Sequence, residues 1–103
     1  MSVTVYGVRL RGTCEVRYIG FTRYSLDKRL REHLVVASRG PEFRPFPPWL
    51  RENRANVEFF PIAKCETVAE ARKTESVIIA LCLRLDMRLL NGAQVPFHLR
   101  EAA

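Results

Sequence analysis

The chain is 103 residues long and 48% hydrophobic, which matches one folded domain and leaves too little sequence for a second. Charged residues make up 27%, close to the globular average, which argues against a disordered tail or a fibrous repeat. No stretch approaches 18 consecutive apolar residues, and no basic segment followed by an apolar one opens the chain. We therefore expect one domain over residues 1–103 that works in the cytoplasm, with no membrane partner.

Positive charge is concentrated in the first half of the chain. The net charge is +6, from 17 basic and 11 acidic residues. Residues 1–54 hold 11 bases and 5 acids, whereas residues 55–103 hold 6 of each. Fourteen of the bases are arginine, whose planar guanidinium suits phosphate oxygens, so the composition favours a nucleic-acid partner over an acidic protein.

The three cysteines, Cys14, Cys65 and Cys82, are widely spaced and form no Cys-x-x-Cys pair. Their odd number and the scarcity of histidine argue against a zinc site. We expect reduced thiols that pack as small buried side chains.

Three segments have the pattern of β-strands. Residues 3–10 alternate apolar with small or polar positions, as a half-buried strand does. Residues 15–21 resume the alternation after a break around Gly12, which predicts a β-hairpin. Residues 57–63 predict a third strand, in which Pro61 marks an edge or an end.

The first predicted helix follows the hairpin. Ser25 is a typical N-cap residue, and the helix is expected to end near residues 39–40. Its apolar face is formed by Leu26, Leu30, Leu34 and Ala37. Arg29 and His33 are four residues apart and border this face, so we expect them at the rim of the core.

Two further helices are predicted. Residues 49–53 form a short helix that begins just after Pro47 and Pro48. A long helix runs from Thr67 to about residue 85 and opens with a capping box, in which Thr67 pairs with Glu70.

These elements predict a small α/β domain with a three-stranded, mainly antiparallel sheet flanked by helices. Asn91 and Gly92 stop the last segment, so the core covers about residues 3–91. Residues 96–103 form a short tail that packs loosely.

Glu75 is the most informative position in the long helix. Five apolar residues lie within roughly 60° of it on a helical projection: Val68, Ala71, Ile78, Ile79 and Cys82. A carboxylate buried on such a stripe must be neutralised, paired with a base or bound to a metal ion. The alternative is that Val77 and Leu81 mark the core face and that Glu75 is solvated, and both interpretations stay open.

Tyr6 and Tyr18 lie on the two strands of the hairpin, where alternation can place both hydroxyls on one face. Most tyrosines in strands serve packing. Together with Arg29, His33 and Glu75, however, they supply the groups that hydrolyse a phosphodiester at a single metal ion.

In their order along the chain, these residues resemble the GIY-YIG nuclease domain. Thr4-Val5-Tyr6 is followed after eleven residues by Tyr18-Ile19-Gly20, then by Arg29 and His33, by Glu75, and by Leu-Leu-Asn at residues 89–91. The second tripeptide matches the family in full, and the first matches it only in Tyr6. The resemblance spans nearly the whole chain and implies the GIY-YIG fold.

The resemblance implies a divalent-metal-dependent endonuclease that hydrolyses phosphodiester bonds of DNA with Mg²⁺ or Mn²⁺. Glu75 is implied as the metal-binding carboxylate and Arg29 as the clamp on the scissile phosphate. A single carboxylate suits Mg²⁺, which takes its remaining ligands from water and a phosphate oxygen.

The same resemblance implies roles for the other residues. Tyr6 would be the general base or would position the attacking water, and Tyr18 would assist at the phosphate or the water. His33 would help proton transfer, and Asn91 would support the site. Because the ordinary pKa of tyrosine is about 10, Tyr6 needs the metal and Arg29 to favour its phenolate, or a neighbour that accepts its proton.

Arginines of the first half are candidate contacts to the nucleic-acid backbone: Arg9, Arg17, Arg23, Arg31 and Arg39. About a dozen residues follow Asn91, too few for a separate DNA-recognition domain. Specificity would then come from residues 39–56, a homodimer or a partner protein. The aromatic residues Phe43, Phe46 and Trp49 fit either the core or a base-stacking surface.

Two alternatives to a DNA endonuclease stay open. One is a catalytically inactive nucleic-acid-binding module on the same scaffold. The other is a nuclease that acts on single-stranded DNA or on RNA.

Overall fold

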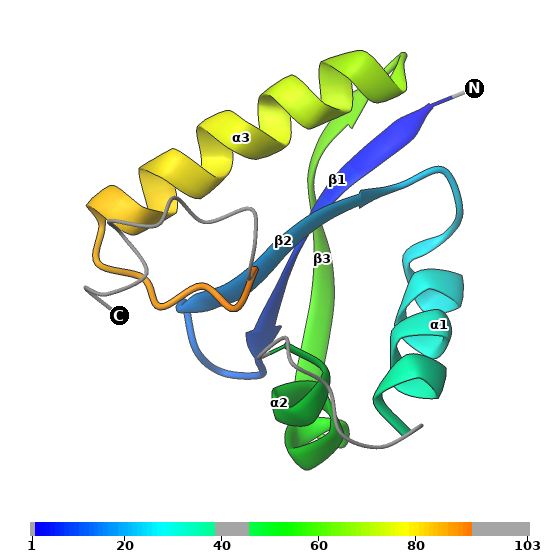
Figure 1. Ribbon diagram of the computed structural model, residues 1–103, viewed down its shortest axis with the longest axis vertical. Helices are drawn as coiled ribbons and strands as arrows, with labels where there is room; N and C mark the ends of the chain where they lie inside the picture. The colour runs from blue at the N-terminus through cyan, green and yellow to red at the C-terminus, as the bar shows by residue number, and fades with distance from the viewer. Residues whose placement is uncertain (1, 39–45, 92–103) are drawn as a thin grey trace.

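Strand β1 (Val3–Leu10) is the centre of the sheet, with β2 (Val16–Thr22) on one side and β3 (Val57–Cys65) on the other (Figure 1). Both pairings are antiparallel. Helices α1 (Leu26–Ser38), α2 (Phe46–Asn53) and α3 (Val68–Arg84) complete the domain. The predicted α/β architecture with a three-stranded sheet is therefore confirmed, and the sheet is antiparallel throughout.

The computed structural model describes residues 2–38 and 46–91. The predictions for the side chain of Ala37, for Arg39, for the helix end near residues 39–40, for Phe43 and for the tail at 96–103 lie outside the described part. Within that part, no helix is long and apolar enough to cross a membrane.

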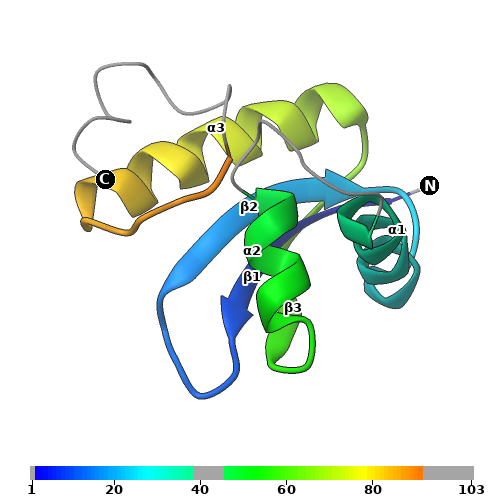
Figure 2. The ribbon, with the colours of Figure 1, turned by 60° about the horizontal axis from the view of Figure 1, so that its bottom comes forward.

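The central strand is buried on both faces, so the prediction of a half-buried β1 was wrong. Val3 and Val5 pack in one hydrophobic cluster with α3, whereas Tyr6 and Val8 pack in a second cluster with α1 and α2. Figures 1 and 2 show α3 on one side of the sheet and the other two helices across it. A strand that pairs along both edges and packs on both faces has no solvated side, which alternation alone could not reveal.

The predicted hairpin is confirmed, and Gly12 lies in its connection with φ +81°, a left-handed backbone that favours glycine. Cys14 lies in this connection as well and is exposed. Its prediction as a buried thiol was wrong, whereas Cys65 and Cys82 are buried as expected, and all three are free thiols.

The edge position of Pro61 is confirmed. Val5 pairs with Ala63 but Tyr6 pairs with Pro61, so Ile62 is an extra residue in β3. Such a bulge on an edge strand tolerates a residue without an N–H group. Because the bulge lets pairing continue, β3 extends to Cys65, two residues beyond the predicted end.

The starts of α1 and α3 are capped as predicted. Ser25 Oγ accepts a hydrogen bond from the backbone N–H of Lys28 at 3.1 Å. Thr67 Oγ1 accepts one from the N–H of Glu70 at 3.1 Å. The carboxylate of Glu70 accepts the N–H of Glu66 at 2.9 Å, one residue before the position that a strict capping box uses.

Helix α2 begins at Phe46, three residues earlier than predicted. Pro47 and Pro48 therefore lie within its first turn, where the missing N–H groups have no intrahelical partner to lose. Phe46 and Leu50 form its buried face.

Candidate active site

Glu75 lies on the buried face of α3, with 5% of its surface exposed. Ala71, Ile79 and Cys82 are buried on the same helix. Val77 and Leu81 are 62% and 55% exposed, so they do not mark the core face. The interpretation with the carboxylate on the apolar stripe is confirmed, and the solvated alternative was wrong.

A hollow of about 390 Å³ lies beside this carboxylate and is lined by Phe21, Arg72, Glu75, Ser76 and Ile79. Burial raises the pKa of Glu75, while the positive charge of Arg72 opposes the shift. Sequence analysis did not single out Arg72, although its position three residues before Glu75 on a helix was a usable signal. The hollow is thus lined by the buried carboxylate of Glu75 and the exposed guanidinium of Arg72.

Tyr6 connects this region to α1. Its hydroxyl lies 2.9 Å from Nε2 of His33, and Arg29 Nε donates a hydrogen bond to the hydroxyl oxygen at 3.3 Å. Burial, followed by the charge of Tyr18, raises the pKa of Tyr6 far above its ordinary value; Arg29 lowers it and Glu75 raises it further. The structure therefore gathers four of the six predicted catalytic residues, Tyr6, Tyr18, Arg29 and His33, on the α1 side of the sheet, and Glu75 on α3 acts on Tyr6 through its charge.

His33 is enclosed by aromatic rings. The rings of Tyr6, Tyr18, Phe46 and Phe59 have centroids 5.2 to 6.4 Å from that of His33. Burial, with the charge of Arg29 as a second cause, lowers the pKa of His33 to about 4. The imidazole is therefore neutral near pH 7, and in the tautomer that carries its proton on Nδ1 the Nε2 atom can accept the proton of Tyr6.

The aromatic residues of α2 belong to this enclosure. Phe46 is buried and stacks on Tyr18 with ring centroids 4.0 Å apart. Trp49 is half-buried and stacks on Phe46 at 6.1 Å. Both residues pack in the core cluster on this face of the sheet, which decides against a base-stacking surface there.

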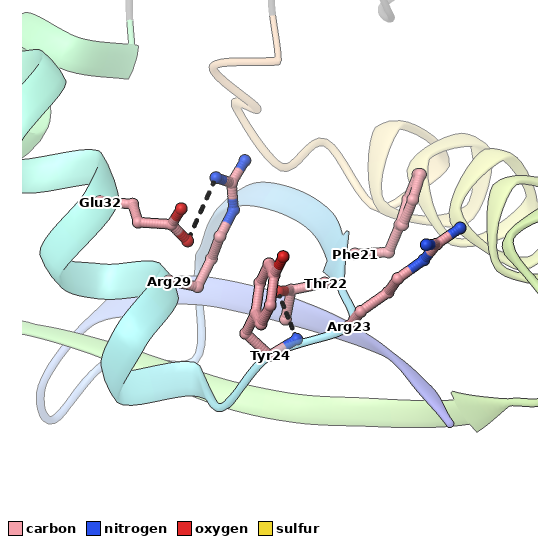
Figure 3. Close-up of a pocket in the computed structure, with 6 residues that line it drawn as sticks. All are labelled: Phe21, Thr22, Arg23, Tyr24, Arg29 and Glu32. Carbon is pink, nitrogen blue, oxygen red and sulfur yellow. Dashed lines mark hydrogen bonds and ion pairs between the residues drawn. The ribbon is translucent and has the colours of Figure 1, made fainter. Parts of the chain in front are cut away.

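A second hollow, of about 190 Å³, lies beside Arg29. Figure 3 shows the side chains that line it, from the end of β2, the following loop and α1: Phe21, Thr22, Arg23, Tyr24, Arg29 and Glu32. Arg29 Nη1 lies 3.9 Å from Glu32 Oε1. Phe21 lines both hollows, so the hollow beside Glu75 and the hollow beside Arg29 adjoin at this residue.

Asn91 holds the edge strand β2. Its Oδ1 accepts the N–H of Ile19 at 3.0 Å, and its Nδ2 donates to the C=O of Ile19 at 2.6 Å. The amide thus substitutes for a neighbouring strand at the middle residue of Tyr18-Ile19-Gly20. This places Asn91 in contact with the backbone that carries Tyr18.

The predicted backbone-binding arginines differ in their surroundings. Arg9 pairs with Glu58 at 2.6 Å and Arg17 with Glu15 at 2.9 Å. Arg23 lines the Arg29 hollow and Arg31 is exposed on α1. Arg39 lies outside the described residues.

Among residues 2–38 and 46–91, no group of three or more His, Cys, Asp or Glu side chains gathers as a metal cage. Mg²⁺ does not require one, because it keeps several waters and is often held by one or two carboxylates together with substrate phosphates. A buried carboxylate beside a hollow that offers no sulfur or imidazole ligand fits such a hard cation.

Comparison with protein-family models, with curated proteins and with solved structures found no match to this chain.

Proposed function

We propose that this protein is a divalent-metal-dependent endonuclease of the GIY-YIG type that hydrolyses phosphodiester bonds of DNA. The observation that carries the proposal is the burial of Glu75, whose charge acts on Tyr6, together with the hydrogen bond from Arg29 to the Tyr6 hydroxyl. A buried carboxylate whose charge acts on a buried phenol is typical of a site that uses the charge. A pure binding surface gains nothing from a carboxylate, which repels phosphate.

The placement of the motif residues supports this family. Tyr6 and Tyr18 extend from adjacent strands with ring centroids 6.4 Å apart. Arg29 and His33 follow on α1, and Glu75 is on α3. Four of the residues that carry the resemblance, Tyr6, Tyr18, Arg29 and His33, thus lie together, although Tyr6 and His33 are 27 positions apart in the chain.

Glu75 would hold the metal ion. When bound, Mg²⁺ polarises a phosphoryl oxygen and lowers the pKa of a coordinated water. The guanidinium of Arg29 would oppose the charge that develops on the phosphate in the transition state. Because Arg29 lies on the hydroxyl of the fully buried Tyr6, a phosphate that draws Arg29 into its hollow would also uncover this hydroxyl.

Proton transfer would run through Tyr6 to His33. The raised pKa of Tyr6 argues against a standing phenolate, so the hydroxyl serves better as a relay. Its oxygen would take a proton from the attacking water as its own proton passes to Nε2 of neutral His33. The phosphorus–oxygen bond to the leaving group breaks as the new one forms, and the leaving oxygen takes a proton from solvent.

Cleavage of supercoiled plasmid and of single-stranded DNA with Mg²⁺ or Mn²⁺ tests the proposal. The matched pair of variants is Glu75→Gln and Glu52→Gln, the same change at an exposed position of α2. We expect cutting that EDTA abolishes, that Glu75→Gln reduces by at least about 100-fold, and that Glu52→Gln leaves intact. Cutting in EDTA, or undiminished cutting by Glu75→Gln, contradicts the proposal. Salt-sensitive DNA binding without cutting by any preparation leaves the binding module as the function.

A further inference from the structure

The Arg29 hollow combines cationic and aromatic side chains in a small volume. The guanidiniums of Arg23 and Arg29 and the rings of Phe21 and Tyr24 all line it, and Figure 3 shows them extending to one side of the backbone. Its volume of about 190 Å³ is below the roughly 300–1,000 Å³ of pockets that enclose a drug-sized ligand. A hollow of this size suits one base or one phosphate group of a strand rather than an enclosed ligand.

Tyr24 is exposed and yet held in place. Tyr24 is 56% exposed, which leaves part of its ring open to a ligand. Its backbone N–H donates to Oγ1 of the buried Thr22 at 3.0 Å, which fixes the loop. The ammonium of Lys28 lies 3.8 Å from the ring centroid and covers one face of the ring. The ring is thus presented beside the arginines in a fixed orientation.

The charges around the hollow favour a phosphate. Arg23, Lys28 and Arg29 are positive, and Glu32 is the negative group among the lining residues. Glu32 already lies 3.9 Å from Arg29. Three positive side chains and one negative side chain leave a net charge of about +2 around the hollow. Arg23 can therefore bind a phosphate next to the one that Arg29 would hold.

We propose that this hollow binds an unpaired nucleotide of a DNA strand directly beside the scissile phosphate. The base stacks on the face of Tyr24 that Lys28 leaves open, and Arg23 holds the adjoining phosphate. This inference rests on the proposed function and names its substrate as DNA with a single-stranded segment at the cleavage point. In a duplex each base is stacked between its neighbours and offers no free face, whereas aromatic residues interleaved with basic ones are typical of single-strand binding.

Equilibrium binding in EDTA tests the inference without requiring cleavage. The probes are a fluorescently labelled dT oligomer and the same oligomer annealed to dA, titrated at one salt concentration with anisotropy as the readout. The variants are Tyr24→Ala and Tyr24→Phe, and Leu85→Ala controls for the loss of an exposed apolar side chain elsewhere.

We expect the single strand to bind more tightly than the duplex. Tyr24→Ala should lose at least about fivefold in affinity for the single strand and less than about twofold for the duplex. Tyr24→Phe should retain the affinity, because the ring and not the hydroxyl does the stacking. Tighter binding of the duplex, or the same affinity of Tyr24→Ala and wild type for the single strand, overturns the inference.

The two proposals fail separately. Tyr24-dependent binding of the single strand, with no metal-dependent cutting of any DNA, overturns the nuclease and keeps the nucleotide site. If cutting depends on Glu75 but Tyr24→Ala does not change binding, the nucleotide site is overturned and the nuclease stands.

Discussion

The hydroxyl of Tyr6 lies across the backbone of Gly20, its partner in the β1–β2 register. A Cβ atom on residue 20 would lie 2.6 Å from the hydroxyl oxygen and 2.8 Å from Cζ of Tyr6. The ring cannot turn away, because it is fully buried and stacks on Phe59 at 5.3 Å. The glycine that ends Tyr18-Ile19-Gly20 therefore provides the space through which Tyr6 reaches His33 and Arg29.

The variant Gly20→Ala tests this relationship. The added methyl group should displace Tyr6, weaken its hydrogen bond to His33 and lower the free energy of unfolding by about 1–3 kcal/mol, as overpacking does. Cleavage should fall as well. Gly12→Ala is the control, since its φ of +81° makes alanine costly while no atom lies within 4 Å of the added Cβ. It should lower stability in chemical denaturation without changing cleavage; wild-type cleavage by Gly20→Ala contradicts the role of the glycine.

The buried His33 makes stability depend on pH. Burial and then Arg29 hold its folded pKa at about 4, below the ordinary 6.5, so the unfolded chain binds the additional proton between these values. This group's contribution is complete above about pH 6.5 and is lost as the pH falls toward 4. We expect the melting temperature of wild type to fall more steeply over this range than that of His33→Gln, whose amide does not titrate. Parallel melting curves for the two proteins would show that His33 titrates normally.

The variant Asn91→Ala tests whether the amide of Asn91 stabilises β2. Removing the amide leaves the N–H and C=O of Ile19 without these bonds at a buried edge, which should cost about 1–3 kcal/mol of unfolding free energy. Asn53→Ala is the comparison, because Nδ2 of Asn53 donates to the C=O of Trp49 near a more solvated helix end. The loss of unfolding free energy should be smaller for Asn53→Ala. Equal losses for the two variants in urea denaturation would argue against a special role of Asn91 in stabilising β2.

Within the described part of the chain, the candidate DNA-contacting arginines fall into two groups, those that form ion pairs on the surface and those that do not. Arg9 and Arg17 already form ion pairs with carboxylates, whereas Arg23 lines a hollow and Arg31 is exposed. We expect Arg23→Gln and Arg31→Gln each to reduce the slope of log K against log salt by about 0.7–0.9, the value for one phosphate contact. Arg9→Gln should change it little. The same reduction for all three variants would show that the ion pair between Arg9 and Glu58 opens on binding.

Much of the fold follows from local patterns in the sequence. Capping residues such as Ser25 and Thr67, the apolar stripe around Glu75 and the proline of the edge strand act through near neighbours, so their effects can be predicted from spacing. Burial of β1 on both faces could not be predicted in this way, because it depends on which strands pair with it. The stacking of Phe46, the first residue of α2, on Tyr18 likewise joins residues distant in the chain and could not be predicted from spacing.

The candidate site shows the same division. The motif residues were identified by their order, but the cage around His33 depends on Phe46 and Phe59, whose contact with His33 no pattern in the sequence indicates. Tyr24 gave no signal in the sequence, since an aromatic residue in a loop has no periodicity to interpret. Its significance comes from the hollow that it shares with Arg29.

The burial of Glu75 predicts that stability and activity respond oppositely to one substitution. Its folded pKa is raised above the ordinary 4.5, so the folded state loses stability as the pH rises from about 4.5 through the raised value. Glu75→Gln does not ionise, and its melting temperature relative to wild type should therefore increase over this range, although the variant does not cut. Mg²⁺ should raise the melting temperature of wild type near pH 7 but not that of Glu75→Gln, because binding to the folded state stabilises it by mass action. Equal stabilisation of both proteins by Mg²⁺ would place the cation elsewhere, and a variant destabilised at every pH would mean that the carboxylate is a structural partner in the core.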